Sequence, residues 1–144
     1  MIWFIMPTLS LEDIQLINFI EMSTGAKAND LVRDENALII VVQKGELGKA
    51  IGKAGANVQK LRQKTGKEIV VIEDSDDAKA FLANVLAPAV LRNVAVSENG
   101  GKKVAIVDVD SKNRGGAIGR GGEKIKRARL LLQRKFGFDD VKLR

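Results

Sequence analysis

Two stretches of the chain combine glycine with lysine or arginine in the same order. The first, "IGKAGANV", covers residues 51–58, and the second, "IGRGGEKI", covers residues 118–125. In each, a Gly-x-x-Gly unit stands between two apolar residues. Glycine has no Cβ, so the main-chain amides around it can approach a ligand closely, and neighbouring cations attract an anion. The chemistry that these residues favour is therefore the binding of phosphate groups.

Other phosphate-binding motifs do not match the spacing. A P-loop requires Gly, four residues and then Gly-Lys followed by Ser or Thr, and a dinucleotide fingerprint requires Gly-x-Gly-x-x-Gly. Neither stretch satisfies either pattern. A purely structural interpretation stays open at this point, because glycines at a tight helix–helix turn can serve only to permit positive φ angles.

The composition argues against catalysis. The sequence has no cysteine and no histidine, which removes thiol nucleophiles, imidazole bases and nearly all conventional zinc sites. Asp108 and Asp110 alternate on a predicted strand and could hold Mg²⁺, and residues 76–77 and 139–140 are aspartate pairs. All three also suit a strand edge, a helix start and a turn. We predict that the protein is not an enzyme and uses no metal or cofactor.

Positive charge is concentrated around the two glycine stretches. The chain has a formal net charge of +6 and a pI near 9.7. Residues 44–67 contain seven basic residues against one acidic, and residues 112–135 contain nine against one. Together these two segments exceed the net charge of the whole chain, so the remainder is acidic. This distribution indicates an anionic partner such as a nucleic acid.

The glycine stretches belong to a duplicated unit. A shift of 67 positions pairs Gly48 with Gly115 and Arg62 with Arg129, and the glycines of the two motifs coincide. After the motif, a shift of 71 is needed to bring "TGKEIVVI" over "FGFDDVKL". Four residues make about one helical turn, so we expect a longer helix in the second copy. The predicted domains are residues 1–74 and 75–144.

Each copy predicts the same order of elements. A helix opens it: the first follows a capping-box pattern at Ser10 and Asp13 and ends at Gly25, and the second runs from the acidic residues 76–77 to Pro88. Two strands, the glycine loop, a helix ending at glycine and a short closing strand follow. The predicted strands are residues 30–33, 37–43 and 68–72 in the first copy, and 89–97, 102–110 and 139–143 in the second.

At these residues both copies resemble KH domains, whose signature is Ile-Gly-x-x-Gly-x-x-Ile/Val between two helices. The helix-first order resembles the prokaryotic, type II topology. The resemblance implies an α+β fold of two tandem KH domains, each α-β-β-α-α-β, with a three-stranded sheet covered by helices on one face. A pair with hardly any linker is similar to the KH pair of the NusA family, and especially to its short archaeal members.

The function implied by this resemblance is binding of single-stranded RNA during transcription termination or elongation, with the nascent transcript as ligand and RNA polymerase as a candidate second partner. Two alternatives stay open. One is a paired-KH factor in ribosomal RNA maturation, and the other is a KH scaffold that contacts proteins.

The RNA-binding residues implied by the resemblance surround the two loops. The loop residues clamp the sugar-phosphate backbone, the apolar residues border a groove for unstacked bases besides packing in the core, and the flanking cations contact phosphates. The loop residues are Gly52, Lys53, Ala54, Gly55, Gly119, Arg120, Gly121 and Gly122. The apolar residues are Ile51, Val58, Ile118 and Ile125. The flanking cations are Lys49, Lys60, Lys124, Lys126 and Arg127.

Two further features bear on partners. None of the few aromatic residues lies in either loop, so base stacking is expected to be minor. The opening "MIWFIM" stops at Pro7 and is too short for a signal or transmembrane segment. We therefore expect a cytoplasmic monomer with no membrane partner, and whether residues 1–5 belong to the native start is left open.

Overall fold

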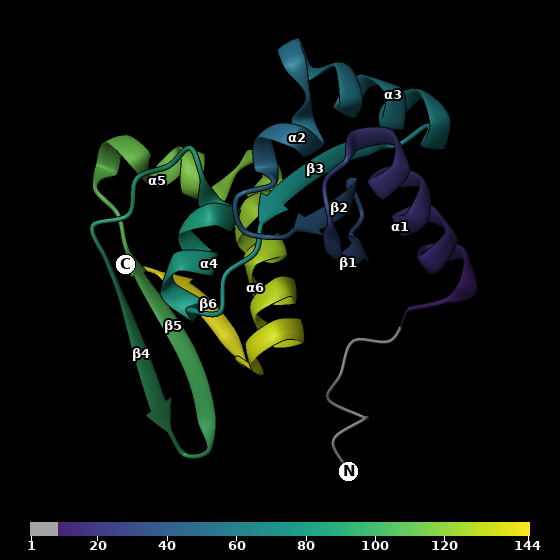
Figure 1. Cartoon of the computed structure of the whole chain (residues 1–144). Coiled ribbons are helices and arrows are strands. Elements are labelled where there is room, and N and C mark those ends of the chain that lie inside the picture. Colours follow the sequence, from purple (N-terminus) through teal and green to yellow (C-terminus); the bar gives the residue numbers. More distant parts are fainter. Residues whose placement is uncertain (1–8) are drawn as a thin grey trace. The chain divides into compact units, whose positions relative to one another are not determined.

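The computed structural model describes residues 9–144, and these divide into two compact units, residues 9–75 and 76–144. Each unit is described here by itself. In the first, the chain runs through one helix, two strands, the glycine-loop region, another helix and a last strand (Figure 1). These elements are α1 (Leu11–Thr24), β1 (Ala28–Arg33), β2 (Ala37–Val42), α2 (Leu47–Ile51), the 3₁₀ turn η2 (Lys53–Gly55), α3 (Ala56–Thr65) and β3 (Glu68–Glu73).

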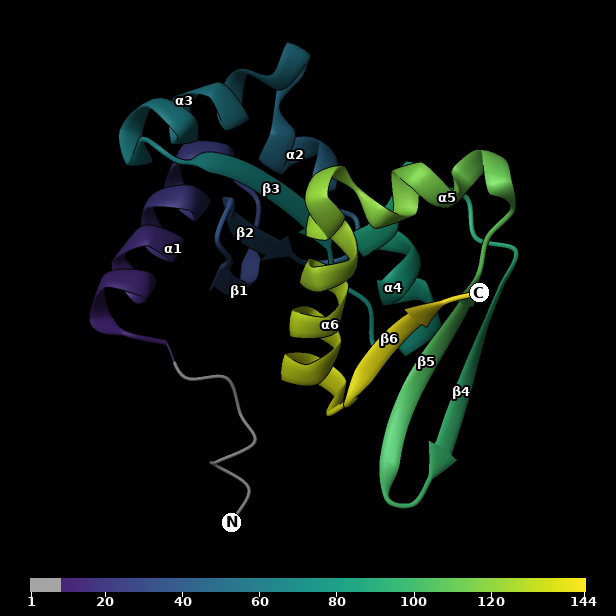
Figure 2. The same cartoon turned by 180° about the vertical axis from the view of Figure 1, so that it is seen from behind.

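The second unit repeats this order element for element (Figure 2). Its members are α4 (Ala78–Leu86), β4 (Asn93–Asn99), β5 (Lys102–Asp108), α5 (Ser111–Ile118), the 3₁₀ turn η3 (Arg120–Gly122), α6 (Glu123–Phe136) and β6 (Asp140–Leu143). The predicted α+β architecture with three-stranded sheets is confirmed. No helix among residues 9–144 is both long enough and apolar enough to cross a lipid bilayer.

Both sheets have the same topology. The strand order is β1-β2-β3 in one unit and β4-β5-β6 in the other. The first two strands of each sheet are antiparallel, and the last strand is parallel to the middle one. A parallel neighbour requires a crossover connection, and the segment that crosses over is the pair of helices joined by the glycine loop. Each glycine loop therefore lies in the crossover connection, between α2 and α3 in the first unit and between α5 and α6 in the second.

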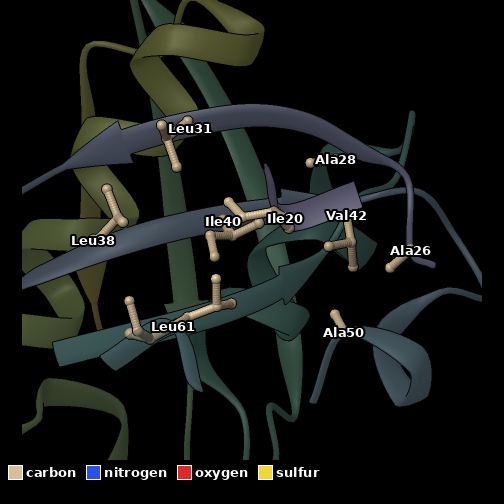
Figure 3. Packing of buried hydrophobic residues seen from close by; sticks show 10 residues of the cluster. Ile20, Ala26, Ala28, Leu31, Leu38, Ile40, Val42, Ala50 and Leu61 are labelled. Carbon is tan, nitrogen blue, oxygen red and sulfur yellow. The ribbon is translucent and has the colours of Figure 1, made fainter. Parts of the chain in front are cut away.

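The core of the first unit lies between its helices and one face of β1-β2-β3 (Figure 3). Leu38, Ile40 and Val42 alternate along β2 and belong to this core together with Ile20 of α1 and Leu61 of α3. Each of these five side chains is at most 1% exposed. Burying such a side chain stabilises the fold by about 1.5–3 kcal/mol, so the core fixes the helices that hold the loop.

Three helices begin at a side-chain cap. Ser10 accepts a hydrogen bond from the amide of Asp13, and Asp77 and Asp110 cap α4 and α5 in the same way. The Asp13 carboxylate completes the predicted capping box and also binds the Arg33 guanidinium of β1, which holds the pKa of Asp13 below its usual value. In each of these helices a side chain therefore accepts from one of the free amides at the helix start.

The sequence predicted the helix lengths and ends well but misplaced one strand. α6 has 14 residues against 10 in α3, so the extra turn is confirmed, and both helices end at a left-handed glycine, Gly66 or Gly137. The start of the strand predicted over residues 89–97 was wrong: β4 begins at Asn93. The amide of Val90 bonds to the Asn113 side chain instead of to a neighbouring strand.

Candidate nucleic-acid interface

The first glycine of each motif ends one helix and opens a 3₁₀ turn. Gly52 has φ 80° and ψ 168°, and Gly119 has φ 77° and ψ 173°. This backbone region is open essentially to glycine alone. A Cβ at Gly52 would lie 2.8 Å from Cγ of Asn57 and 2.9 Å from its main-chain nitrogen. Glycine is therefore required at this position by both torsion angles and space.

The second glycine closes the turn and starts the next helix. The amide of Gly55 donates to the carbonyl oxygen of Gly52 at 3.1 Å, and Gly122 donates to Gly119 at 3.2 Å. Gly55 and Gly122 are both left-handed and are the N-caps of α3 and α6. The two motifs thus have one backbone geometry: a helix end, a 3₁₀ turn and a helix start within four residues.

Both helix starts in each loop lack a side-chain cap. No side chain caps η2 or α3 in the first unit, nor η3 or α6 in the second. The amides of Lys53 and Ala54 are the first N–H groups of η2 and have no acceptor within that turn. Free amides at a helix start, with the positive end of the helix dipole behind them, favour an anion. This distinguishes the loops from the capped starts of α1, α4 and α5.

Exposed cations surround these amides. Lys53 and Arg120 lie inside the turns and are exposed, as are Lys60 and Lys126 one helical turn or more farther on. Lys49 is also exposed, although its Nζ lies 3.3 Å from Glu46 in an ion pair. These five predicted residues are therefore accessible to a phosphate.

Two of the predicted phosphate contacts are partly or largely covered by the protein itself. Arg127 is only 6% exposed, so little of this residue is accessible from solvent. Lys124 donates from Nζ to the carbonyl oxygen of Ala87 at 2.8 Å, and burial together with the nearby Arg127 charge lowers its pKa. A helix places successive residues on different faces, and the charge pattern alone could not tell which face is covered.

The four apolar residues next to the loops divide into two pairs. Ile51 is 36% exposed and Ile118 is half-buried, so both lie at the surface beside a glycine loop. Val58 packs against the first core, and Ile125 is only 7% exposed. The first pair is therefore accessible from solvent, whereas the second pair contributes to packing.

Sequence reasoning missed three residues at the loops. Asn57 donates from Nδ2 to the carbonyl oxygen of Lys49 at 2.8 Å and packs against Gly52. The repeat alignment held a signal, because the same shift pairs Asn57 with Lys124, which packs against Gly119 in the same way. Lys112 and Arg114 are exposed on α5, before the second loop, and belong to the basic segment 112–135.

Among the described residues, no group of three or more acidic side chains is arranged to hold a metal ion. The loops themselves present uncapped helix starts and exposed cations, and such groups can bind an anion through hydrogen bonds and charge.

Comparison with known proteins gives two kinds of similarity. A family model described as "KH domain" matches residues 16–99, which include the first glycine loop. Proteins called "Probable transcription termination protein NusA" are similar over nearly the whole chain. The protein from Halococcus morrhuae is 41% identical over 94% of this chain and 97% of its own length. The one from Halobacterium salinarum is 42% identical over 94% and 96%.

A solved structure has the same fold over almost all of the chain. The structure described as "Crystal structure of APE1850" superposes with a TM-score of 0.87 at 36% sequence identity. The match covers 94% of this chain and all of that one. The similarity therefore extends through both glycine loops.

Proposed function

Because this chain belongs to the family of archaeal NusA-like proteins with a KH domain, we propose that it binds single-stranded RNA as a transcription factor. In this proposal both units are type II KH domains in tandem, and the ligand is the nascent transcript. Binding acts on transcription termination, which the names of the relatives mention, or on elongation, and RNA polymerase is the second partner. The protein binds its ligand and catalyses no reaction.

The observation that carries the proposal is the repeated pair of uncapped helix starts beside an exposed cation. Each loop offers helix starts that no side chain caps and one exposed basic residue, Lys53 or Arg120. The helices that start elsewhere with a side-chain cap do not offer this. Two sites of the same geometry in one chain fit a polymer with repeating phosphates better than a single small anion.

In the proposed mechanism each loop clamps the backbone of about four nucleotides, as Gly-x-x-Gly loops of KH domains do. Phosphate oxygens accept from the free amides, and Lys53 or Arg120 adds a second, charged contact. Ile51 and Ile118 contact the bases that leave the stack. Because phosphate contacts dominate, affinity falls as salt rises, with a slope of about 0.7 logarithmic units per phosphate neutralised on a single strand.

The test is a variant in which the two middle residues of each loop become aspartate: Lys53, Ala54, Arg120 and Gly121. The new carboxylates repel phosphate, so binding to a single-stranded oligouridylate should be lost. Asp tolerates a left-handed backbone better than most residues, so the circular-dichroism melt should change little. The matched control, Lys27→Glu, Lys67→Glu and Lys79→Glu, makes the same overall change of charge at exposed residues outside the loops.

We expect the control to bind RNA with a modestly reduced affinity, because only long-range attraction is weakened. Retained affinity in the loop variant would mean that the clamp lies elsewhere. Equal losses in the two variants would mean that binding depends only on total charge. A folded control and a folded loop variant with a large difference in affinity would support the proposed site.

A further inference from the structure

The sheet β4-β5-β6 has two unlike faces. Along its strands, Val94, Ala105, Val107 and Val141 share one side and are at most 8% exposed. This side packs toward α6, which contacts β6 (Figure 2). Alternate residues point to opposite faces of a strand. The intervening residues therefore make up the second face, which we call the outer face.

The outer face has an aliphatic centre. Ala95 of β4 is paired with Ile106 of β5. Val104, two residues before Ile106 in β5, lies on the same side of the sheet. All three are only partly buried. The buried residues of β4, β5 and β6 all lie on the opposite side, and the residues beside the aliphatic centre are polar. Apolar side chains are thus left accessible in the middle of a sheet.

The charges on the outer face are mostly positive. Lys102 and Lys142 lie on strand positions that share this side, and both are exposed; Arg144, which follows β6 directly, is exposed as well. The two aspartates of the same side are already neutralised: Asp108 pairs with Arg92 at 3.0 Å and Asp140 with Arg129 at 2.8 Å. The outer face therefore presents aliphatic groups between cations that have no ion-pair partner among the described residues.

This combination selects the kind of partner. Platforms that bind unpaired bases use aromatic side chains, and residues 93–108 and 140–144 contain none. Aliphatic groups flanked by cations match a peptide whose apolar and acidic side chains alternate, since an extended chain presents the two kinds at a period of two. In addition, the outer edge of β4 pairs with no other strand in the described part of the chain, which leaves room for an extended segment.

We propose that the outer face of β4-β5-β6 binds an extended acidic segment of a partner protein. The apolar side chains of the segment cover Val104 and Ile106, and its carboxylates meet Lys102 and Lys142. This surface is distinct from the two glycine loops, so the protein holds RNA and a protein partner at separate places.

The experiment is an NMR titration of the full ¹⁵N-labelled chain with a decapeptide of alternating glutamate and valine. Amide shifts are expected at Ala95, Val104 and Ile106. Lys102→Glu with Lys142→Glu should weaken binding about tenfold, because two attractions between exposed charges become repulsions. Lys27→Glu with Lys79→Glu is the control for total charge and should change affinity much less.

Two further titrations separate the alternatives. The aspartate variant of both loops should bind the peptide as the unchanged chain does, so a failure of the RNA proposal leaves this result intact. An oligouridylate should shift the loop amides and not the outer face. The inference is overturned if the peptide shifts only loop residues, if a lysine–valine peptide binds equally well, or if oligouridylate shifts the same outer-face amides.

Discussion

The two glycine loops have nearly the same backbone but different side chains at the third position of the motif. Ala54 has φ 55° and ψ 27°, and Gly121 has φ 62° and ψ 19°. A left-handed conformation costs an L-residue with a Cβ about 1–2 kcal/mol. The first loop carries this cost and the second avoids it. The common geometry is therefore imposed by the flanking glycines and helices and not by the residue at the third position.

The loops also differ in what holds them. In the first, Asn57 bonds to the carbonyl oxygen of Lys49, in the helix that leads into the loop. In the second, Lys124 reaches the carbonyl oxygen of Ala87, just beyond the end of α4. Asn57 and Lys124 occupy the same position of the repeat. Asn57 bonds to a residue 8 positions away in the chain, and Lys124 to one 37 positions away. The two copies thus share the loop geometry but differ in the contacts that support it.

Among variants that change only one loop, the largest expected effect is a loss of RNA affinity. Lys53→Asp with Ala54→Asp, or Arg120→Asp with Gly121→Asp, should each lower RNA affinity roughly a hundredfold, because two linked sites become one. The second pair should have the greater effect, since segment 112–135 holds more basic residues than segment 44–67. Fluorescence anisotropy with an oligouridylate at several salt concentrations measures both affinity and slope. If one of these two double variants binds RNA as tightly as the unchanged chain, only the other loop is a clamp.

The next largest effect concerns stability at the first glycine of each motif. Gly52→Ala should destabilise the fold by about 2–3 kcal/mol, because the torsion angles exclude Cβ and Asn57 blocks its space. Gly119→Ala should cost somewhat less, since the nearest atoms of Lys124 lie at 3.0 Å instead of 2.8 Å. Urea unfolding followed by circular dichroism measures both changes.

The control for this pair is the glycine four residues earlier. Gly48 and Gly115 lie within α2 and α5, and a Cβ at either meets no atom within 4 Å. Alanine there should stabilise the helix by about 0.5–1 kcal/mol. An equal response of Gly48→Ala and Gly52→Ala would contradict the assigned backbone of the loop.

The sequence predicted the parts of the molecule that depend on local rules. The repeat and its glycines located the loops, the capping box at Ser10 located α1, and Gly66 and Gly137 located the ends of the loop helices. Each of these signals acts through neighbours within a few residues along the chain. Such rules hold whatever the rest of the fold does.

The features that the sequence did not predict depend on contacts between distant segments. The burial of Arg127 and the bond from Lys124 to Ala87 require knowing which side of α6 is covered. The start of β4 was misplaced because the Asn113 side chain takes the amide of Val90 out of strand pairing. The sequence pattern around a charged or β-branched residue does not reveal whether tertiary contacts expose that residue or bury it.

The smallest effect tests the difference between Ala54 and Gly121 directly. Ala54→Gly should stabilise the fold by about 0.5–1 kcal/mol, because relief of the left-handed strain exceeds the added entropy of an unfolded glycine. Gly121→Ala should destabilise it by about 1 kcal/mol for the opposite reason, and a Cβ at Gly121 meets no atom within 4 Å, so crowding contributes nothing. Urea unfolding of both variants and of the double exchange measures these changes. The double exchange should be nearly neutral, because it moves one strained residue from one loop to the other. Two changes of the same sign would show that the loops do not share a backbone conformation in solution.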